Sequence, residues 1–178
     1  MGKKRMRWEL AGAAFVLVAG VLLHFVYQWS GENGVVAAFS AVNESVWEHM
    51  KLVFVPLFVW TMVELFFLGR DYPGFLAVRG VTTLLGTALV PILFYTYTGI
   101  LGRHCLWADI AVFVLAVLAA FWADERLLRG GRLSSGWMQV AGLAVLWAMA
   151  FLFVLWTYRP PHLPLFQDAL TLAYGVTR

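Results

Sequence analysis

Residues 136–157 read GWMQVAGLAVLWAMAFLFVLWT, an unbroken stretch that carries no charged side chain. A helix that crosses the hydrocarbon core of a bilayer needs about 20 apolar residues, so this stretch is long enough to span a membrane. The chain contains further stretches close to that length, at residues 8–28, 46–68, 76–98 and 107–123. Short segments rich in glycine and charged residues separate them, which is typical of loops. The sequence therefore predicts five membrane-spanning segments.

The overall composition supports a chain that lies in a bilayer. The 178 residues are 62% hydrophobic and 13% charged, and the mean hydropathy is +0.78. A water-soluble domain of this size cannot bury that much apolar surface in one core. Because lipid leaves free backbone groups unsatisfied, and the alternation typical of barrels is absent, the spans are expected to be helices. We therefore expect an all-α fold, a polytopic membrane helix bundle that forms one domain over residues 1–178, with residues 158–178 as an outer tail.

The distribution of basic residues predicts the orientation of the chain, since cytoplasmic loops carry an excess of Lys and Arg. With the N-terminus inside, the cytoplasmic side holds nine of them: Lys3, Lys4, Arg5, Arg7, Arg70, Arg79, Arg126, Arg129 and Arg132. The other side holds Lys51, Arg103, Arg159 and Arg178. We expect a multi-pass protein of the plasma membrane with its N-terminus in and its C-terminus out. Its expected partner is the lipid bilayer and not a nucleic acid, and its oligomeric state is left open.

The nonapeptide Asn43-Glu-Ser-Val-Trp-Glu-His-Met-Lys51 places several ionisable groups at the start of the second span. Ser45 and Glu48 have the S-x-x-E spacing of a capping box, which predicts a helix that begins just after Ser45, with Asn43 as a rival cap. Glu48 and Lys51 share a helix face, whereas His49 points about 100° away from Glu48. Dipole compensation and an ion pair explain part of this motif. Ionisable groups in a membrane segment are nevertheless often functional.

Other polar residues fall at the same outer ends of the predicted spans, where they can meet the nonapeptide. The residues that we expect to ligate a metal are His24, Glu44, Glu48, His49 and Asp109. Of these, Glu48, His49 and Glu44 are also the candidate catalytic residues. Further residues expected to line the site are Asn43, Lys51, Tyr27, Tyr95, Tyr97, His162 and Asp168. Imidazole and carboxylate ligands together suit Zn, Mn or Fe. The proline-rich tail is expected to fold back over this site as a lid.

Two further features have simple structural interpretations. Glu64 lies near the inner end of the second span, where we expect it to pair with Arg70 or Arg79. A proton or ion path through the bundle would require Glu64 to be linked to the outer residues. Tryptophans near the span ends, Trp47 among them, are expected in the aromatic belts of the membrane interfaces.

These motifs resemble an uncharacterised family of small bacterial multi-spanning membrane proteins, a domain of unknown function. The resemblance rests on residues 24–31, 43–51, 95–102 and 109–110. Its most specific part is the Asn-Glu-Ser-x-Trp-Glu-His-x-Lys motif, and the tail from His162 to Gly175 is similar too. Residues 169–173 depart from the Pro/Gly-containing turn of the family. The resemblance implies the membrane class and the same set of residues, and no activity.

Three functions are compatible with such a site. The first is a metal-assisted or acid–base hydrolase or transferase that acts on an amphipathic or lipid substrate at the outer leaflet. The second is a transporter or channel component that uses the same residues as a binding vestibule. The third is a non-catalytic membrane scaffold in which the motif forms an ion-pair network. The enzyme is favoured slightly, and convergence of side chains from several helices on one pocket would support it.

Overall fold

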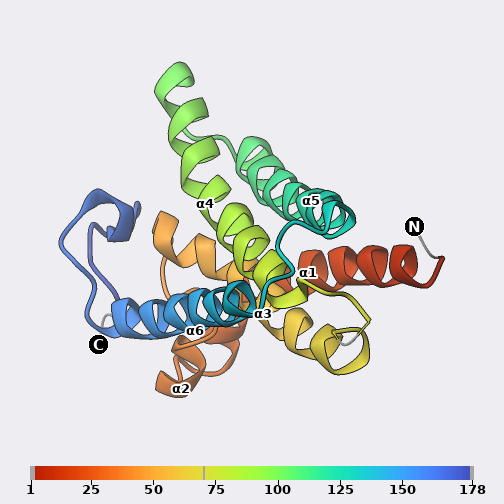
Figure 1. Ribbon diagram of the computed structural model, residues 1–178. Coiled ribbons are helices and arrows are strands. Elements are labelled where there is room, and N and C mark those ends of the chain that lie inside the picture. The colour runs from red at the N-terminus through yellow and green to blue at the C-terminus, as the bar shows by residue number, and fades with distance from the viewer. Residues whose placement is uncertain (1–2, 70, 177–178) are drawn as a thin grey trace.

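The computed structural model describes residues 3–69 and 71–176 (Figure 1). Its long helices are α1 (Lys3–Trp29), α3 (Val46–Phe67), α4 (Phe75–Leu101), α5 (Leu106–Gly130) and α6 (Gly136–Tyr158). The short elements are α2 (Gly34–Ala37) and a 3-10 turn, η1 (Pro164–Phe166). The described residues form no strand, only one isolated bridge between Gln167 and Tyr174. The five long helices are apolar enough to cross a membrane, so the all-α fold and the five spans are confirmed.

Helices α3 and α6 begin and end close to the predicted limits. Helices α1 and α5 are longer than predicted, because they continue through the charged residues that flank their apolar stretches. Helix α1 already includes Arg5, and α5 continues past Asp124 and Glu125 to Gly130. These charged residues looked like the ends of the spans in the sequence. They fit inside the helices because Arg5 bonds to Asp124 (2.7 Å) and to Glu125 (3.1 Å), which joins the start of α1 to the end of α5.

Helix α4 packs against α3, α5 and α6, and α1 packs on α3 (Figure 1). The α4–α6 contact depends on two glycines. A Cβ atom on Gly80 would lie 2.7 Å from the Cα of Gly142, and one on Gly142 would lie 2.2 Å from the carbonyl oxygen of Leu76. The two backbones therefore touch with no room for a side chain. Close approach at small residues is a common way of packing membrane helices.

A cluster of aromatic residues joins α3, α6 and the tail. Trp47 is only 6% exposed, and its ring lies 4.4 Å from that of Phe153, 5.1 Å from Trp156 and 4.8 Å from Phe166. The prediction that Trp47 belongs to an aromatic belt is therefore wrong, because the tail covers it. Other tryptophans near the span ends remain exposed, as a belt requires: Trp29, Trp107, Trp122 and Trp137.

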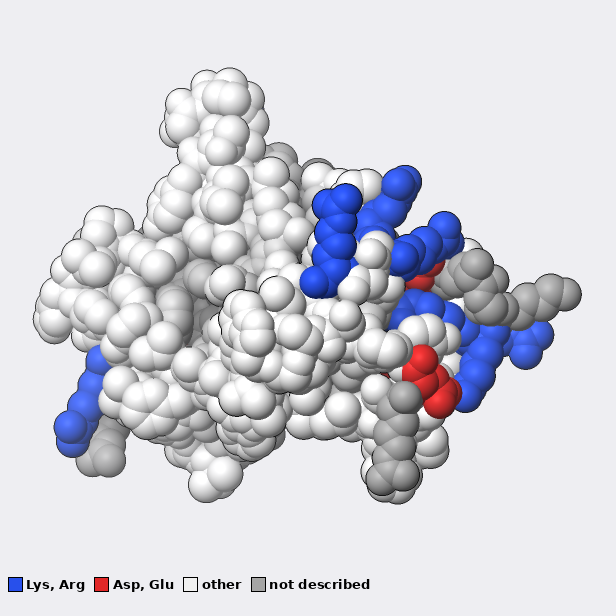
Figure 2. All heavy atoms as spheres, in the orientation of Figure 1, with Lys and Arg blue, Asp and Glu red and all other residues white. Residues whose placement is uncertain are grey.

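The antiparallel helices give the bundle two distinct ends, which we call the Arg5 end and the His24 end. The Arg5 end holds the start of α1, the α3–α4 turn and the end of α5, which ion pairs tie together. The His24 end holds the end of α1, the start of α3 and the tail. Lys and Arg gather around the Arg5 end (Figure 2). Arg70 and Arg178 of the predicted charge bias lie outside the described residues.

Candidate metal centre

The segment before α3 is shaped by its own polar side chains. Ser45 Oγ accepts a hydrogen bond from the Glu48 amide (3.3 Å), so Ser45 caps the helix, which starts at Val46 as predicted. The second half of the capping box is not formed. The Ser45 amide instead donates to Asn43 Oδ1 (2.9 Å), and the Glu48 carboxylate accepts from the Val42 amide (3.1 Å). These hydrogen bonds shape the turn before α3, and Glu44 lies on this turn between Asn43 and Ser45.

His24, Glu44 and His49 meet at the His24 end, and we call them the metal triad. His24 Nε2 lies 3.8 Å from Glu44 Oε1, and His49 Nε2 lies 3.5 Å from Glu44 Oε2. The two imidazole rings are 5.3 Å apart. One ligand atom from each residue falls within 4.8 Å of the others, which is close enough for all three to hold one metal ion. Helix α1, the turn before α3 and the first turn of α3 each supply one residue.

The two histidine rings are oriented by different contacts. His49 Nδ1 lies 2.9 Å from the Ser45 carbonyl oxygen, which leaves Nε2 to face Glu44. A metal-bound histidine usually donates its other ring N–H to such an oxygen. His24 Nδ1 is buried and has no hydrogen-bond partner. Its ring packs edge-on against Phe25, 4.9 Å away.

The metal triad lines a pocket of about 440 Å³. His104 and Asp109 lie in the same pocket. Asp109 accepts a hydrogen bond from the Tyr97 hydroxyl, and its other oxygen lies 3.5 Å from His104 Nδ1. Most of the remaining wall is apolar and comes from α3, α4, α5 and the tail: Leu52, Val90, Phe94, Val112, Phe113 and Leu170. The pocket therefore combines a polar triad, a polar pair and an apolar wall.

Glu48, predicted as both ligand and catalytic residue, lies apart from the metal triad. It is 1% exposed and pairs with Lys51 Nζ at 2.6 Å. Lys51 also donates to the Ala37 carbonyl oxygen (2.9 Å) and to Thr157 Oγ1 (2.8 Å). The pair thus ties α3 to α2 and α6. The 100° between Glu48 and His49 on the helix explains why the two residues have different partners.

The tail folds back onto the segment before α3, as predicted. Asp168 accepts hydrogen bonds from the Glu44 amide (3.3 Å), the Leu170 amide (3.1 Å) and the Thr171 hydroxyl. Partial burial raises the pKa of Asp168, but these hydrogen bonds outweigh it and hold the pKa below its usual value. Asn43 Nδ2 donates to the Gly175 carbonyl oxygen (3.0 Å). Asp168 and Asn43 therefore brace the triad from outside and do not enter it.

The structure places the other predicted residues away from the metal triad. Asp109 lines the pocket but is engaged by Tyr97 and His104. The His162 ring stacks on Tyr174 at 4.6 Å, away from the pocket lining. Tyr27 is buried and Tyr95 is exposed, and neither lines the pocket.

His104, Ala169 and Leu170 also line the pocket, although they were not among the predicted site residues. The sequence signal for His104 was its position five residues before Asp109, across the start of a span. No comparable signal marked Ala169 and Leu170, because they reach the pocket only through the fold of the tail.

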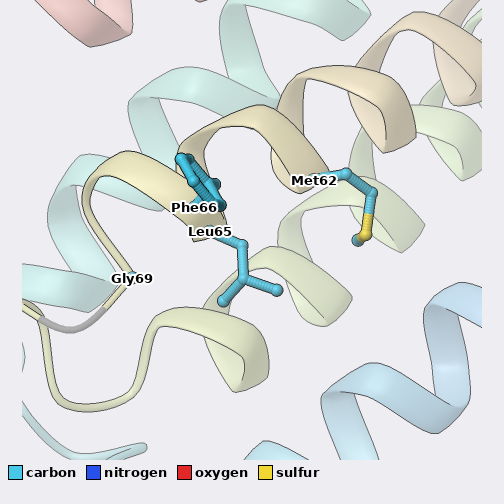
Figure 3. Close-up of a pocket in the computed structure, with 4 residues that line it drawn as sticks. All are labelled: Met62, Leu65, Phe66 and Gly69. Carbon is cyan, nitrogen blue, oxygen red and sulfur yellow. The ribbon is translucent and has the colours of Figure 1, made fainter.

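A second hollow lies at the opposite end of α3, with a volume of about 650 Å³. It is lined by Met62, Leu65, Phe66 and Gly69, and Figure 3 shows Met62 and Leu65 pointing the same way from the helix. None of these side chains can carry out acid–base chemistry or bind a metal in the manner of the triad. The chemistry of the described residues therefore favours the pocket at the His24 end.

The sequence model of a family of unknown function, DUF6512, matches residues 1–176, so the chain belongs to this family. This confirms the resemblance to an uncharacterised family. No curated protein and no solved structure matches the chain.

Proposed function

We propose that this member of DUF6512 binds a divalent transition metal at His24, Glu44 and His49 and uses it for hydrolysis or group transfer on an amphipathic substrate. The observation that carries the proposal is the convergence of three ligand atoms within 4.8 Å beside a half-apolar pocket. We further propose that this end faces the extracytoplasmic side of the plasma membrane, as the bias in basic residues suggests.

The spacing of the triad suits a metal ion such as Zn²⁺. In a tetrahedral zinc site with bond lengths of about 2.0–2.1 Å, neighbouring ligand atoms are about 3.3 Å apart. The two His–Glu separations of 3.5 and 3.8 Å are only slightly longer, and they run to the two different oxygens of Glu44, so binding through one oxygen would require a small movement of the carboxylate. Three protein ligands leave one coordination position open, which is typical of catalytic zinc. A metal bound there would lower the pKa of a coordinated water and supply a nucleophile at neutral pH.

His104 and Asp109 provide the acid–base chemistry in this proposal. Asp109 Oδ2 lies 3.5 Å from His104 Nδ1, so it can hold the imidazole with Nε2 available to take up or give a proton. Tyr97 donates to the other oxygen of Asp109 and fixes the carboxylate. The apolar wall formed by Val90, Phe94 and the neighbouring side chains suits the hydrocarbon part of the substrate. The polar head group would then lie between the metal and His104.

The test is metal binding by purified protein in detergent, measured by elemental analysis and by titration with Zn²⁺, Mn²⁺ and Fe²⁺. We expect one ion per chain in the wild type. His24→Ala and His49→Ala each remove a ligand, and we expect at least a tenfold weaker affinity from either change, because loss of a residue that only orients a ligand already costs about 10–100-fold. Glu44→Gln keeps the shape and removes the charge, so it should weaken binding as well.

The matched control is His162→Ala, which removes an exposed histidine at the same end that does not line the pocket. It should bind metal as the wild type does. A wild-type protein that binds none of the three ions, or equal losses in His49→Ala and His162→Ala, would contradict the proposal.

Transport is the second candidate, because buried threonines extend from the Arg5 end towards the middle of the bundle. The hydroxyls of Thr61, Thr83 and Thr87 are buried and have no hydrogen-bond partner. In that case the metal triad would be an entry vestibule. Metal-dependent flux into liposomes, without turnover of a lipid substrate, would favour transport over the enzyme. The ion-pair scaffold would show neither metal binding nor flux.

A further inference from the structure

A group of charged side chains is buried at the Arg5 end, far from the metal triad. Arg5 and Glu9 come from α1, Glu64 from α3, Arg79 from α4 and Asp124 from α5, and we call these five residues the charge cluster. None is more than 7% exposed. Each of four membrane-spanning helices therefore contributes at least one buried charge. Such residues in a membrane segment are costly and are usually functional.

Two arginines hold the charge cluster together. Arg5 Nη2 lies 2.8 Å from Glu9 Oε1 and 2.7 Å from Asp124 Oδ2. Arg79 Nη2 pairs with Glu64 Oε2 and also lies 3.5 Å from Glu9 Oε1, while its Nε lies 3.5 Å from Asp124 Oδ1. Glu9 and Glu64 thus share one nitrogen of one guanidinium. The two carboxylates have to lie close to each other as a result.

The charges in the cluster do not balance. Glu9, Glu64 and Asp124 supply three carboxylates, whereas Arg5 and Arg79 supply two guanidinium groups. Glu125 at the rim bonds to Arg5 Nε but also pairs with Arg129, so it brings a basic partner of its own. One negative charge is left over. An uncompensated charge inside a protein is strongly unfavourable, and carboxylates that share a site do not both remain ionised.

Unpartnered polar atoms at the cluster point to a bound proton. Glu9 Oε2 and Glu64 Oε1 are buried without a hydrogen-bond partner of normal geometry, and the Trp60 indole N–H, which is also buried and unpartnered, lies beside Glu64. Thr83, one turn beyond Arg79, and Thr61, one turn before Glu64, also have buried hydroxyls without a partner. Helical threonines usually bond to a carbonyl oxygen of the preceding turn, and these two do not. Glu9 of α1 and Glu64 of α3 therefore offer acceptors for a proton, and Thr61 and Thr83 offer polar sites for the water that would deliver it.

We propose that Glu9 and Glu64 together bind one exchangeable proton, next to the Arg79 guanidinium. This proton balances the charge cluster and satisfies one of the two free carboxylate oxygens. The charged groups that face the pair from the surrounding helices are Arg5, Arg79, Asp124 and Glu125. Lys4 and Asp71 pair with each other at the surface, 3.6 Å apart. The site is independent of metal binding at the His24 end.

The test is infrared spectroscopy of the wild-type protein in a maltoside detergent, which has no ester carbonyl of its own. We expect the carbonyl stretch of a protonated carboxylic acid at neutral pH, a shift of that band in D₂O and its disappearance at high pH. Each of the single variants Glu9→Gln and Glu64→Gln leaves two carboxylates for the two arginines of the charge cluster. Each variant should therefore lose the band at neutral pH and remain folded.

The matched control is Asp71→Asn, which removes an exposed carboxylate at the same end and should leave the band unchanged. Absence of the band from the wild type at neutral pH would overturn the proposal without any variant. Its persistence in both glutamine variants would overturn it too, because the proton would then belong to another group.

Discussion

Asp168 connects the tail to the turn that carries Glu44 through its ionised carboxylate. Its carboxylate accepts hydrogen bonds from the Glu44 and Leu170 amides and from the Thr171 hydroxyl. From the sequence we expect Asp168 at this end of the molecule, but no pattern predicts its hydrogen-bond partners. Its partners depend on a turn in the tail, where the Asp168 amide donates to the Ala173 carbonyl oxygen (2.9 Å). Leu172 in this turn has a φ of +60°, a conformation that is uncommon for a residue other than glycine.

Protonation of Asp168 is expected to loosen the tail. Its pKa is lower in the folded protein than in the unfolded chain, so the ionised form stabilises the folded tail. That contribution is complete above the unfolded value of about 3.9 and is lost as the pH falls through the lower, folded value. Hydrogen exchange of residues 161–176, corrected for the intrinsic effect of pH, should show less protection below about pH 4.

Asp168→Asn should reduce the protection of the tail already at neutral pH and should remove this pH dependence. Equal protection of the tail in wild type and variant, at every pH, would show that the carboxylate does not hold the tail. Aromatic packing of Phe166 on Trp47 would then be sufficient by itself.

Helix α4 packs against three of the other four long helices, α3, α5 and α6. Its contact with α6 depends on Gly80, where an added Cβ would lie 2.7 Å from Gly142 Cα and 2.8 Å from its carbonyl oxygen. Its other end, around Gly99, is open, because an added Cβ there meets no atom within 4 Å. The two glycines therefore have different roles on one helix.

Gly80→Ala should destabilise the bundle, while Gly99→Ala should be neutral or mildly stabilising. The first change forces α4 and α6 apart, and overpacking of this kind typically costs about 1–3 kcal/mol. The second only improves helix propensity, by about 0.5–1 kcal/mol. Thermal unfolding in detergent, followed by circular dichroism, measures both. A Gly80→Ala protein as stable as Gly99→Ala would mean that the helices separate at little cost.

At the scale of the whole molecule, the two ends carry different chemistry. The His24 end holds the metal triad and a half-apolar pocket, whereas the Arg5 end holds the buried charge cluster and most of the basic residues. The buried threonines of α3 and α4 extend from the Arg5 end towards the middle of the bundle. Which end faces the cytoplasm is a prediction from the basic residues, and the single cysteine offers a direct test.

Cys105 is exposed at the start of α5, at the His24 end. If that end is extracytoplasmic, a membrane-impermeant maleimide should label the wild-type protein in intact cells. As a control, Cys105→Ser combined with Ser134→Cys moves the thiol to an exposed loop position at the Arg5 end. This double variant should be labelled only after the membrane is permeabilised. The reverse pattern would invert the predicted topology.

The sequence by itself determined the number of spans, their approximate limits and the start of α3 at the Ser45 cap. These features depend on local hydropathy, on helix length and on hydrogen bonds between near neighbours, which a linear pattern records. It also indicated His24, Glu44 and His49, since ionisable residues near the end of a span are conspicuous.

Only the tertiary structure separated the metal triad from the Glu48–Lys51 pair and revealed the charge cluster. Glu48 and His49 are adjacent in the sequence, yet the helix turns them towards different partners that come from other helices. The pairing of Glu64 with Arg79, one of the two alternatives expected from the sequence, is confirmed. Arg5 and Asp124 are distant from that pair in the sequence, and each alone resembled a charge at a membrane interface. Their burial depends on how four helices pack, because a buried charge is stable only where its partners are brought to it.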